Sequence, residues 1–375
     1  MVTDFRLFQN PNLVTLAAES QVLSLYLRQV KCVDETEHEG IWPFVGEGIA
    51  NDAIRLRTLT TSQQGAKGSQ IQGFSPVMDL GSNYQDGTII RFNQRLVAFP
   101  LLSNGSYPLT VNVALTLIEE DWGGQMDEVS AATLKAIGNF IKSEVSTATT
   151  TAVSAGVGGA IGTAFGPLGT VVGSGIGAAI GFIVQQLGAG LDALKSDAFS
   201  PQDVSIVLAN SKARFTNSSR LPQVLVFEGF GGKYEVTCEW RIGSPDRRVA
   251  LRTYNGSYVM AINGGGGLVN AVSQQPSPLE WETFTLEDIA AGQISLKSYD
   301  GKILSMEGIS LAANRRLVGE METFSLRRIS GDKFAILGPN RKYLSAINGG
   351  GEKLEFVREE RYGVAEWETF TLQTL

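Results

Sequence analysis

The sequence has little of the side-chain chemistry that most enzymes need. His38 is the only histidine, and Cys32 and Cys238 are the only cysteines. One histidine removes multi-histidine zinc sites and the Ser-His-Asp triad from consideration. Two cysteines make no disulfide framework, and both lie in strand-like segments that can be neighbours in one sheet, so we expect free, buried thiols. A phosphate loop and a nucleophile elbow are also missing. We therefore expect a protein that is not an enzyme.

Charged side chains are also scarce, and the shortage is local. They make up 18% of the sequence, against about 25% in a typical protein, and residues 145–191 contain none. Residues 247–375 carry 15 basic and 15 acidic side chains, so the formal net charge of −7 falls on the first 246 residues. Neither part has the basic excess of a nucleic-acid-binding surface, and we expect no nucleic-acid partner.

The uncharged stretch has glycines at intervals of four residues. They form two series: Gly158, Gly162 and Gly166, then Gly169, Gly173, Gly177 and Gly181. Residues four apart share one face of an α-helix, so each series predicts a groove against which another helix can pack. Pro167 divides the stretch into two expected helices, about 147–165 and 168–187, each close to the roughly 20 apolar residues that span a bilayer. We predict a helical hairpin that enters lipid, or alternatively one buried inside a soluble protein or an oligomer interface.

The segments before and after this stretch have the pattern of β-structure. Residues 109–118 alternate apolar and polar side chains, as in a half-buried strand, and further strand-like runs lie at 204–208, 223–227 and 234–240. This pattern predicts an antiparallel β-sandwich over residues 1–245, with a helical insertion at 126–195. With a further β-rich domain after it, the expected fold class is multidomain α+β.

Acidic side chains cluster in two expected loops of the sandwich. The candidate metal ligands are Asp34, Glu35, Glu37 and Asp121. Oxygen ligands at one end of a sandwich suit a hard cation such as calcium, and the arrangement faintly resembles the calcium- and lipid-binding sandwich family. The alternative is a solvated acidic loop. We expect no other cofactor.

The last third of the chain repeats three times. The sequences Trp281-Glu282-Thr283-Phe284, Met321-Glu322-Thr323-Phe324 and Trp367-Glu368-Thr369-Phe370 are one motif in steps of 40 and 46 residues. Hairpin signals precede each copy, with turns at 255–256, 300–301 and 340–341. Three units of four strands predict a closed, twelve-stranded domain at 246–375 in which the Trp, Phe and Leu of each repeat share one core.

Residues 247–375 resemble the fascin-like β-trefoil, whose repeats carry a hairpin of the Gly-Lys-Tyr-Leu type and end in a Trp-Glu-x-Phe pattern. Repeat two departs from that pattern, with Met321 in place of Trp and no polyglycine loop. The resemblance implies recognition of a glycan or a protein on pockets between strands. An exposed aromatic ring with amide and carboxylate groups suits sugars. The candidate residues are Tyr254, Asn263, Asn270, Asn348 and Glu352.

Two functions follow from these features. The first is a membrane-active, pore-forming or toxin-like protein, in which the trefoil binds a glycan or protein receptor and the hairpin inserts into a lipid bilayer and forms a homo-oligomer. The alternative is a soluble carbohydrate- or cytoskeleton-binding protein with the hairpin buried. The first ten residues contain no apolar run. We therefore expect no secretory signal, and either a cytoplasmic protein or non-classical export to a target membrane.

Overall fold

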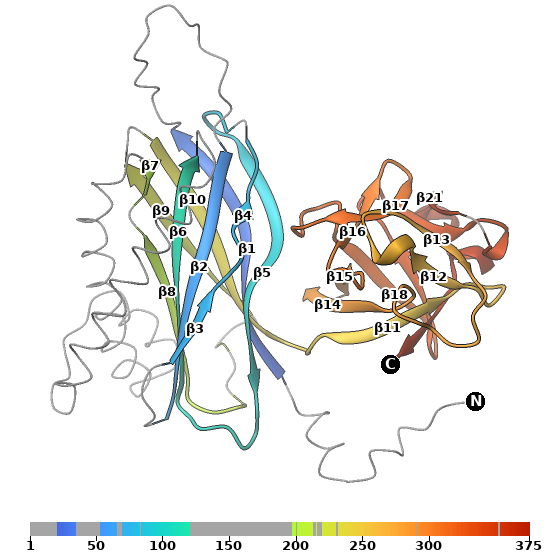
Figure 1. Cartoon of the computed structure of the whole chain (residues 1–375), viewed down its shortest axis with the longest axis horizontal. Helices are drawn as coiled ribbons and strands as arrows, with labels where there is room; N and C mark the ends of the chain where they lie inside the picture. Colours follow the sequence, from blue (N-terminus) through green and yellow to red (C-terminus); the bar gives the residue numbers. More distant parts are fainter. Residues whose placement is uncertain are drawn as a thin grey trace, which may run out of the picture. The chain divides into compact units, whose positions relative to one another are not determined.

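The computed structural model forms two compact units. It describes residues 21–34, 53–65, 70–82, 84–120, 197–199, 201–212, 215, 220–229, 232–290, 292–351 and 353–375. One unit comprises Met1–Ile90 and Leu96–Ile242, and the other comprises Arg91–Arg95 and Gly243–Leu375. Figure 1 shows the described strands of both, coloured along the chain.

The first unit is built from two sheets. One sheet has the order β5-β1-β10-β9, made of β5 (Ile89–Leu101), β1 (Gln21–Asp34), β10 (Gly232–Gly243) and β9 (Arg220–Gly229). The other has the order β3-β2-β6-β7, with β4 on β2 and β8 on β6. Its strands are β2 (Ala53–Gln64), β3 (Gln70–Phe74), β4 (Met78–Asp79), β6 (Leu109–Glu120), β7 (Asp197–Ala198) and β8 (Gln202–Leu208). In Figure 1 the long strands β2, β6, β1 and β10 run the length of this unit.

Aromatic side chains connect the two sheets of this unit. Tyr234, on β10, meets Phe199, which directly follows β7, with ring centroids 5.5 Å apart in an edge-to-face arrangement. Every second residue of β10 from Tyr234 to Trp240 is buried, as expected for a strand with one face on a core. The alternation predicted for residues 109–118 lies on β6, which pairs antiparallel with β2 on one side and β8 on the other.

The two cysteines lie on neighbouring strands, as the sequence predicts, and both are buried thiols that form no disulfide. Two cross-strand ion pairs align β1 with β10: Arg28–Glu239 at 2.8 Å and Lys31–Glu235 at 3.2 Å. Cys32 therefore lies near Glu235 and Cys238 near Arg28, about 13 Å apart along the strands, beyond the roughly 7 Å that a disulfide bridges. Burial raises the pKa of the Cys238 thiol to about 12.

The expected α+β class is wrong for the part of the chain that the structure describes. The elements named there are strands and short 3-10 turns, joined in antiparallel sheets, with no α-helix among them. The α component of the expectation came only from residues 126–195, which carry the seven spaced glycines and lie outside the described residues. Among those described, no helix has the length and apolarity to cross a membrane.

Twelve strands form the second unit, and six of them close into a ring. They are β11 (Arg247–Arg252), β14 (Phe284–Ala290), β15 (Gln293–Lys297), β18 (Phe324–Ser330), β19 (Lys333–Leu337) and β22 (Phe370–Thr374). Each pairs antiparallel with the next, and β22 pairs back to β11. The other six form three hairpins: β12 (Tyr258–Ala261) with β13 (Gly267–Ser273), β16 (Ile303–Glu307) with β17 (Ser310–Arg315), and β20 (Lys342–Ala346) with β21 (Leu354–Glu359). A six-stranded ring with three hairpins is the trefoil-like arrangement that the triple repeat predicts.

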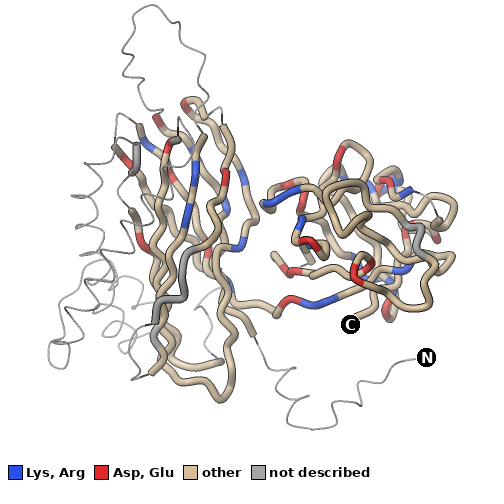
Figure 2. The backbone as a smooth tube through the Cα atoms, in the orientation of Figure 1, with Lys and Arg blue, Asp and Glu red and all other residues tan. Residues whose placement is uncertain are grey.

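The three repeats share one core. Phe284, Phe324 and Phe370 are buried in a single cluster with the leucines of the hairpins, and Phe324 stacks on Phe356 with ring centroids 5.7 Å apart. Because each repeat supplies equivalent side chains, no repeat has a core of its own. Figure 2 shows basic and acidic positions interspersed along the strands of both units.

Candidate functional site

Each copy of the Trp-Glu-Thr-Phe motif closes a turn through its Glu and Thr side chains. The carboxylate accepts a hydrogen bond from the backbone N–H three residues before it, and the Thr hydroxyl donates to the carbonyl four residues before it. The carboxylate bonds are Leu279 N to Glu282 Oε2 (3.0 Å), Gly319 N to Glu322 Oε2 (2.8 Å) and Ala365 N to Glu368 Oε2 (3.1 Å). The hydroxyl bonds are Thr283 to Leu279 (2.7 Å), Thr323 to Gly319 (2.7 Å) and Thr369 to Ala365 (2.8 Å). The Glu and Thr of the motif thus have a structural role.

The first residue of each motif points to solvent, which corrects the expectation that Trp shares the core with Phe and Leu. Trp281 is 41% exposed, Met321 44% and Trp367 43%. The first two residues of the motif lie in the turn before β14, β18 or β22. The Glu is buried and bonded to the backbone of that turn, and the residue before it is left on the outside. The repeat therefore builds a surface position that carries an indole in two of its three copies.

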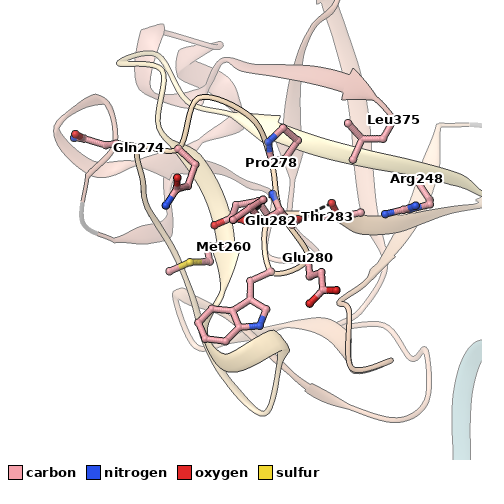
Figure 3. Close-up of a pocket in the computed structure, with 11 residues that line it drawn as sticks. Arg248, Met260, Gln274, Pro278, Glu280, Glu282, Thr283 and Leu375 are labelled. Atoms are coloured by element: carbon pink, nitrogen blue, oxygen red, sulfur yellow. Dashed lines mark hydrogen bonds between the residues drawn. The ribbon is translucent and has the colours of Figure 1, made fainter. Parts of the chain in front are cut away.

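Trp281 borders an open groove of about 1090 Å³. Its wall comes from the start of β11, from β12, from the segment before β14 and from the chain's last residue. The lining residues are Arg248, Met260, Gln274, Gln275, Pro278, Leu279, Glu280, Trp281, Glu282, Thr283 and Leu375. In Figure 3, Met260 and Gln274 lie on one side of the view, Arg248 and Leu375 on the other, and Glu280 between them. The groove therefore joins apolar side chains to amides, a carboxylate and a guanidinium.

Glu280 links this groove to the hairpin turn of the next repeat. Tyr299, in the turn between β15 and β16, is 57% exposed. The negative charge of the Glu280 carboxylate, together with a hydrogen bond between the two side chains, raises the pKa of Tyr299. Glu280 therefore interacts with an exposed phenol and directly precedes an exposed indole. Tyr299, Trp281 and Glu280 are not among the ligand contacts that the sequence predicts. The signal available in the sequence was the equivalence of Tyr254 and Tyr299, each one residue before the Asn-Gly or Asp-Gly turn.

The candidate sugar-binding residues of the sequence are spread over several places. Tyr254 is 60% exposed, in the turn between β11 and β12. Asn263 and Asn348 are exposed in two 3-10 turns, Ile262–Gly264 and Ile347–Gly349, and both have left-handed backbone angles, with φ of 56° and 58°. Asparagine tolerates that conformation better than most residues, which gives both a role in the backbone turn. Whether their side chains also contact a ligand stays a prediction.

The remaining candidates are less informative. Asn270 is half-buried on β13, where it pairs with Met260 of β12. Its backbone also forms an isolated antiparallel β-bridge with Lys353. Glu352 lies outside the described residues. Asp34 is exposed at the end of β1, and the other proposed calcium ligands, Glu35, Glu37 and Asp121, fall on undescribed positions. Across the described part of the chain, no group of three or more metal-ligating side chains occurs, so calcium binding stays untested.

Comparison with known proteins gives likenesses only among solved structures. No family model and no curated protein matches the chain. Among solved structures it is similar to a designed 3-fold symmetric protein, ThreeFoil, with 16% sequence identity and a TM-score of 0.30. The match covers 34% of this chain and 99% of that one. The trefoil-like arrangement of residues 247–375 rests on the strand pairings described above.

Proposed function

We propose that the C-terminal unit binds carbohydrate in the groove beside Trp281. The observation that carries the proposal is an exposed indole in a groove that also presents amides, a carboxylate and a guanidinium. A sugar ring has an apolar C–H face, which packs on an aromatic ring, and hydroxyl groups at its edge, which both donate and accept hydrogen bonds. The groove offers partners for both halves of such a ligand.

The polar lining favours a neutral, hydroxyl-rich ligand over a charged one. Arg248 supplies only donors and Glu280 only acceptors, while Gln274 and Gln275 supply both. Glu282 also lines the groove, but it is buried and accepts the Leu279 N–H. The side-chain charges open to a ligand are therefore those of Arg248 and Glu280, which oppose each other. A ligand with many hydroxyls can satisfy all of these groups at once.

A glycan array probed with the full chain tests the proposal. We expect wild type to bind a defined set of glycans, and Trp281→Ala to weaken that binding at least tenfold, because stacking and burial against the indole are lost. Met321→Ala is the matched control: Met321 occupies the same motif position with similar exposure but lines no part of this groove. Unchanged binding by Trp281→Ala, or no glycan bound by wild type, would overturn the proposal.

The membrane-active, toxin-like role stays a prediction from the sequence, because residues 145–191 lie outside the described part of the chain. In that role the carbohydrate site would select the target surface. Dye release from liposomes by wild type, compared with the Gly173→Leu and Gly177→Leu double variant, measures it. We expect leakage to fall in the variant if close packing of this stretch is required. Equal leakage would remove the packing explanation.

A further inference from the structure

Repeats one and three carry the same glycine loop with the same backbone. Asn263 and Asn348 have φ and ψ within 2° of each other, at 56° and 26° and at 58° and 26°. Gly264 and Gly349, which follow them, both have φ of 80°. Repeat two has no counterpart, since β16 passes to β17 through a turn at Gly308 and Ile309.

Each glycine loop is held against the hairpin turn of the repeat that follows it around the ring. In one case Asp300 N donates to Gly264 O at 3.1 Å, and in the other Asn255 N donates to Gly349 O at 3.0 Å. Asn255 adds a bond from Nδ2 to Gly350 O at 2.7 Å. The residue before each of these turn residues is a tyrosine, so both loops have an exposed phenol beside them.

At Gly349 the two aromatic side chains of this second loop flank the same point. A side-chain carbon placed on Gly349 would lie 3.6 Å from Cδ1 of Tyr254 and 3.8 Å from Cδ1 and Nε1 of Trp367. Tyr254 is 60% exposed and Trp367 43%. Glycine therefore leaves the space between a phenol and an indole free of any side chain, and both rings remain open to solvent.

We propose that Tyr254 and Trp367, on either side of Gly349, form a second carbohydrate site, so that one chain carries two such sites and not one or three. This inference rests on the proposed function of the Trp281 groove. The ligand class is a neutral pyranoside, whose C–H face packs on the rings. Exposed Asn348, which directly precedes Gly349, supplies an amide group for hydroxyls. The amide of Asn255 holds the loop in place instead, because it donates to Gly350 O and accepts from Ser257 N.

The third sector of the trefoil lacks all three parts of the site. Met321 replaces the indole, Pro339 replaces the tyrosine, and Gly308 with Ile309 replaces the glycine loop. A proline ring and a thioether offer no aromatic face with a donor at its edge. The structure therefore assigns sites to the sectors with Trp281 and Trp367 and leaves this sector without one.

The test is ¹⁹F NMR of the full chain labelled with 5-fluorotryptophan. The chain has five tryptophans, and Trp281→Phe and Trp367→Phe assign the two signals of interest. The probes are methyl β-D-galactopyranoside, methyl N-acetyl-β-D-glucosaminide and methyl α-D-mannopyranoside. We expect at least one to shift both the Trp281 and Trp367 signals saturably and to leave buried Trp240 unchanged.

The outcomes separate this inference from the proposed function. A shift of Trp281 alone keeps the first site and overturns the second. A shift of Trp367 alone supports the second site and overturns the groove. If neither signal moves with any probe, both fail.

A variant gives an independent check of the second site. Tyr254→Ala changes an exposed side chain, so the fold should persist. We expect it to weaken binding at Trp367 at least tenfold and to leave the Trp281 shift intact. Pro339→Ala, at the equivalent turn position of the third sector, is the control and should change neither. Equal affinity at Trp367 in Tyr254→Ala would overturn the proposed pairing of the two rings.

Discussion

Repeats one and three differ from repeat two at the surface and agree with it in the core. All three supply a buried phenylalanine to one cluster, and all three close the same turn with a Glu and a Thr. Only repeats one and three add an exposed indole and a glycine loop. The shared residues build the common core and its turns. The indoles and glycine loops that differ lie at the surface and are not part of the six-stranded ring. Departures from the repeat therefore point to function more directly than the repeat itself.

The largest expected effect tests the equality of the cores. Phe284→Ala, Phe324→Ala and Phe370→Ala should each lower the free energy of unfolding by about 3–5 kcal/mol, because each removes a fully buried ring from one shared cluster. Hydrogen exchange of peptides from β14, β18 and β22 in the full chain measures the change in this unit. Met321→Ala is the exposed control, with an effect within about 0.5 kcal/mol. A much smaller loss for Phe324→Ala would show that repeat two is not an equal partner.

The sequence predicts the core of this unit better than its surface. Alternation with period two and the triple motif were sufficient for the strands and for Phe284, Phe324 and Phe370. They were not sufficient for Trp281, because hydrophobicity alone places an indole inside, and only the buried Glu beside it shows which face turns outward. Tyr254 could be named from its turn. Its proximity to Trp367 depends on the docking of Asn255 on Gly349, a contact between residues far apart in the chain.

In the first unit, the hydrophobic pattern of the sequence predicts strands better than it predicts burial or fold class. The alternation of residues 109–118 correctly predicts a strand but not its burial. The polar residues Thr110, Asn112 and Thr116 are buried as well, so the strand is not half-buried as expected. The predicted fold class depended on residues 126–195, which the structure does not describe. The only basis for expecting helices there was the local pattern of apolar residues and regularly spaced glycines. The spacing of the acidic residues in the two loops does not define a metal geometry. The exposed position of Asp34 at the end of β1 therefore does not test the calcium prediction.

The buried carboxylates are the next way to compare the repeats. Glu322 and Glu368 also accept a bond from a serine hydroxyl, Ser305 at 2.7 Å and Ser345 at 2.5 Å. In repeat one Met260 takes that serine position. We expect Glu322→Ala and Glu368→Ala to destabilise the unit by about 2–3 kcal/mol, because a buried N–H and a hydroxyl lose a charged acceptor.

Glu282→Ala should cost less, about 1–2 kcal/mol, because no serine hydroxyl is left behind. Denaturant unfolding of the full chain, followed with the same exchange peptides, compares the three variants. Glu366→Ala, which changes an exposed carboxylate next to Trp367, is the control. An equal loss in all three motifs would mean that the serine bond contributes nothing.

The glycine loops give a smaller effect that still separates the repeats. Gly350 has φ of 117°, and a methyl group there would collide with Thr253 and Asn255. Gly350→Ala should therefore cost about 2 kcal/mol and loosen the second site. Gly308, in repeat two, has φ of 65° and open space around it. Gly308→Ala should cost only about 1 kcal/mol, from the left-handed backbone alone. Thermal unfolding ranks the two, and the reverse order would contradict the docking role of the loop.

The smallest effect concerns Arg341, which stands in place of glycine in the turn between β19 and β20 of repeat three. Arg341 has φ of 60° at the turn position that Gly256 and Gly301 fill with φ of 89° and 77°. Arg341→Gly relieves about 1 kcal/mol of backbone strain. It also raises the conformational entropy of the unfolded chain and removes the ion pair with Glu360 at 2.8 Å, and both of these changes destabilise the fold. These contributions oppose one another, so we expect a net change near zero at neutral pH and low salt.

Salt and acid should shift that balance in one direction. Arg341 and Arg327 hold the pKa of Glu360 below its usual value, so the stabilisation from this pair is present above the unfolded pKa of a glutamate and is lost as pH falls through the lower, folded pKa. In acid, or at 1 M salt, wild type loses the pair and keeps the strain, whereas Arg341→Gly has neither. Unfolding curves of the two proteins should therefore separate in favour of the variant under both conditions. If wild type gains relative to Arg341→Gly as pH falls, the ion pair is not what offsets the left-handed arginine, and the turn must be held by Glu360-independent contacts.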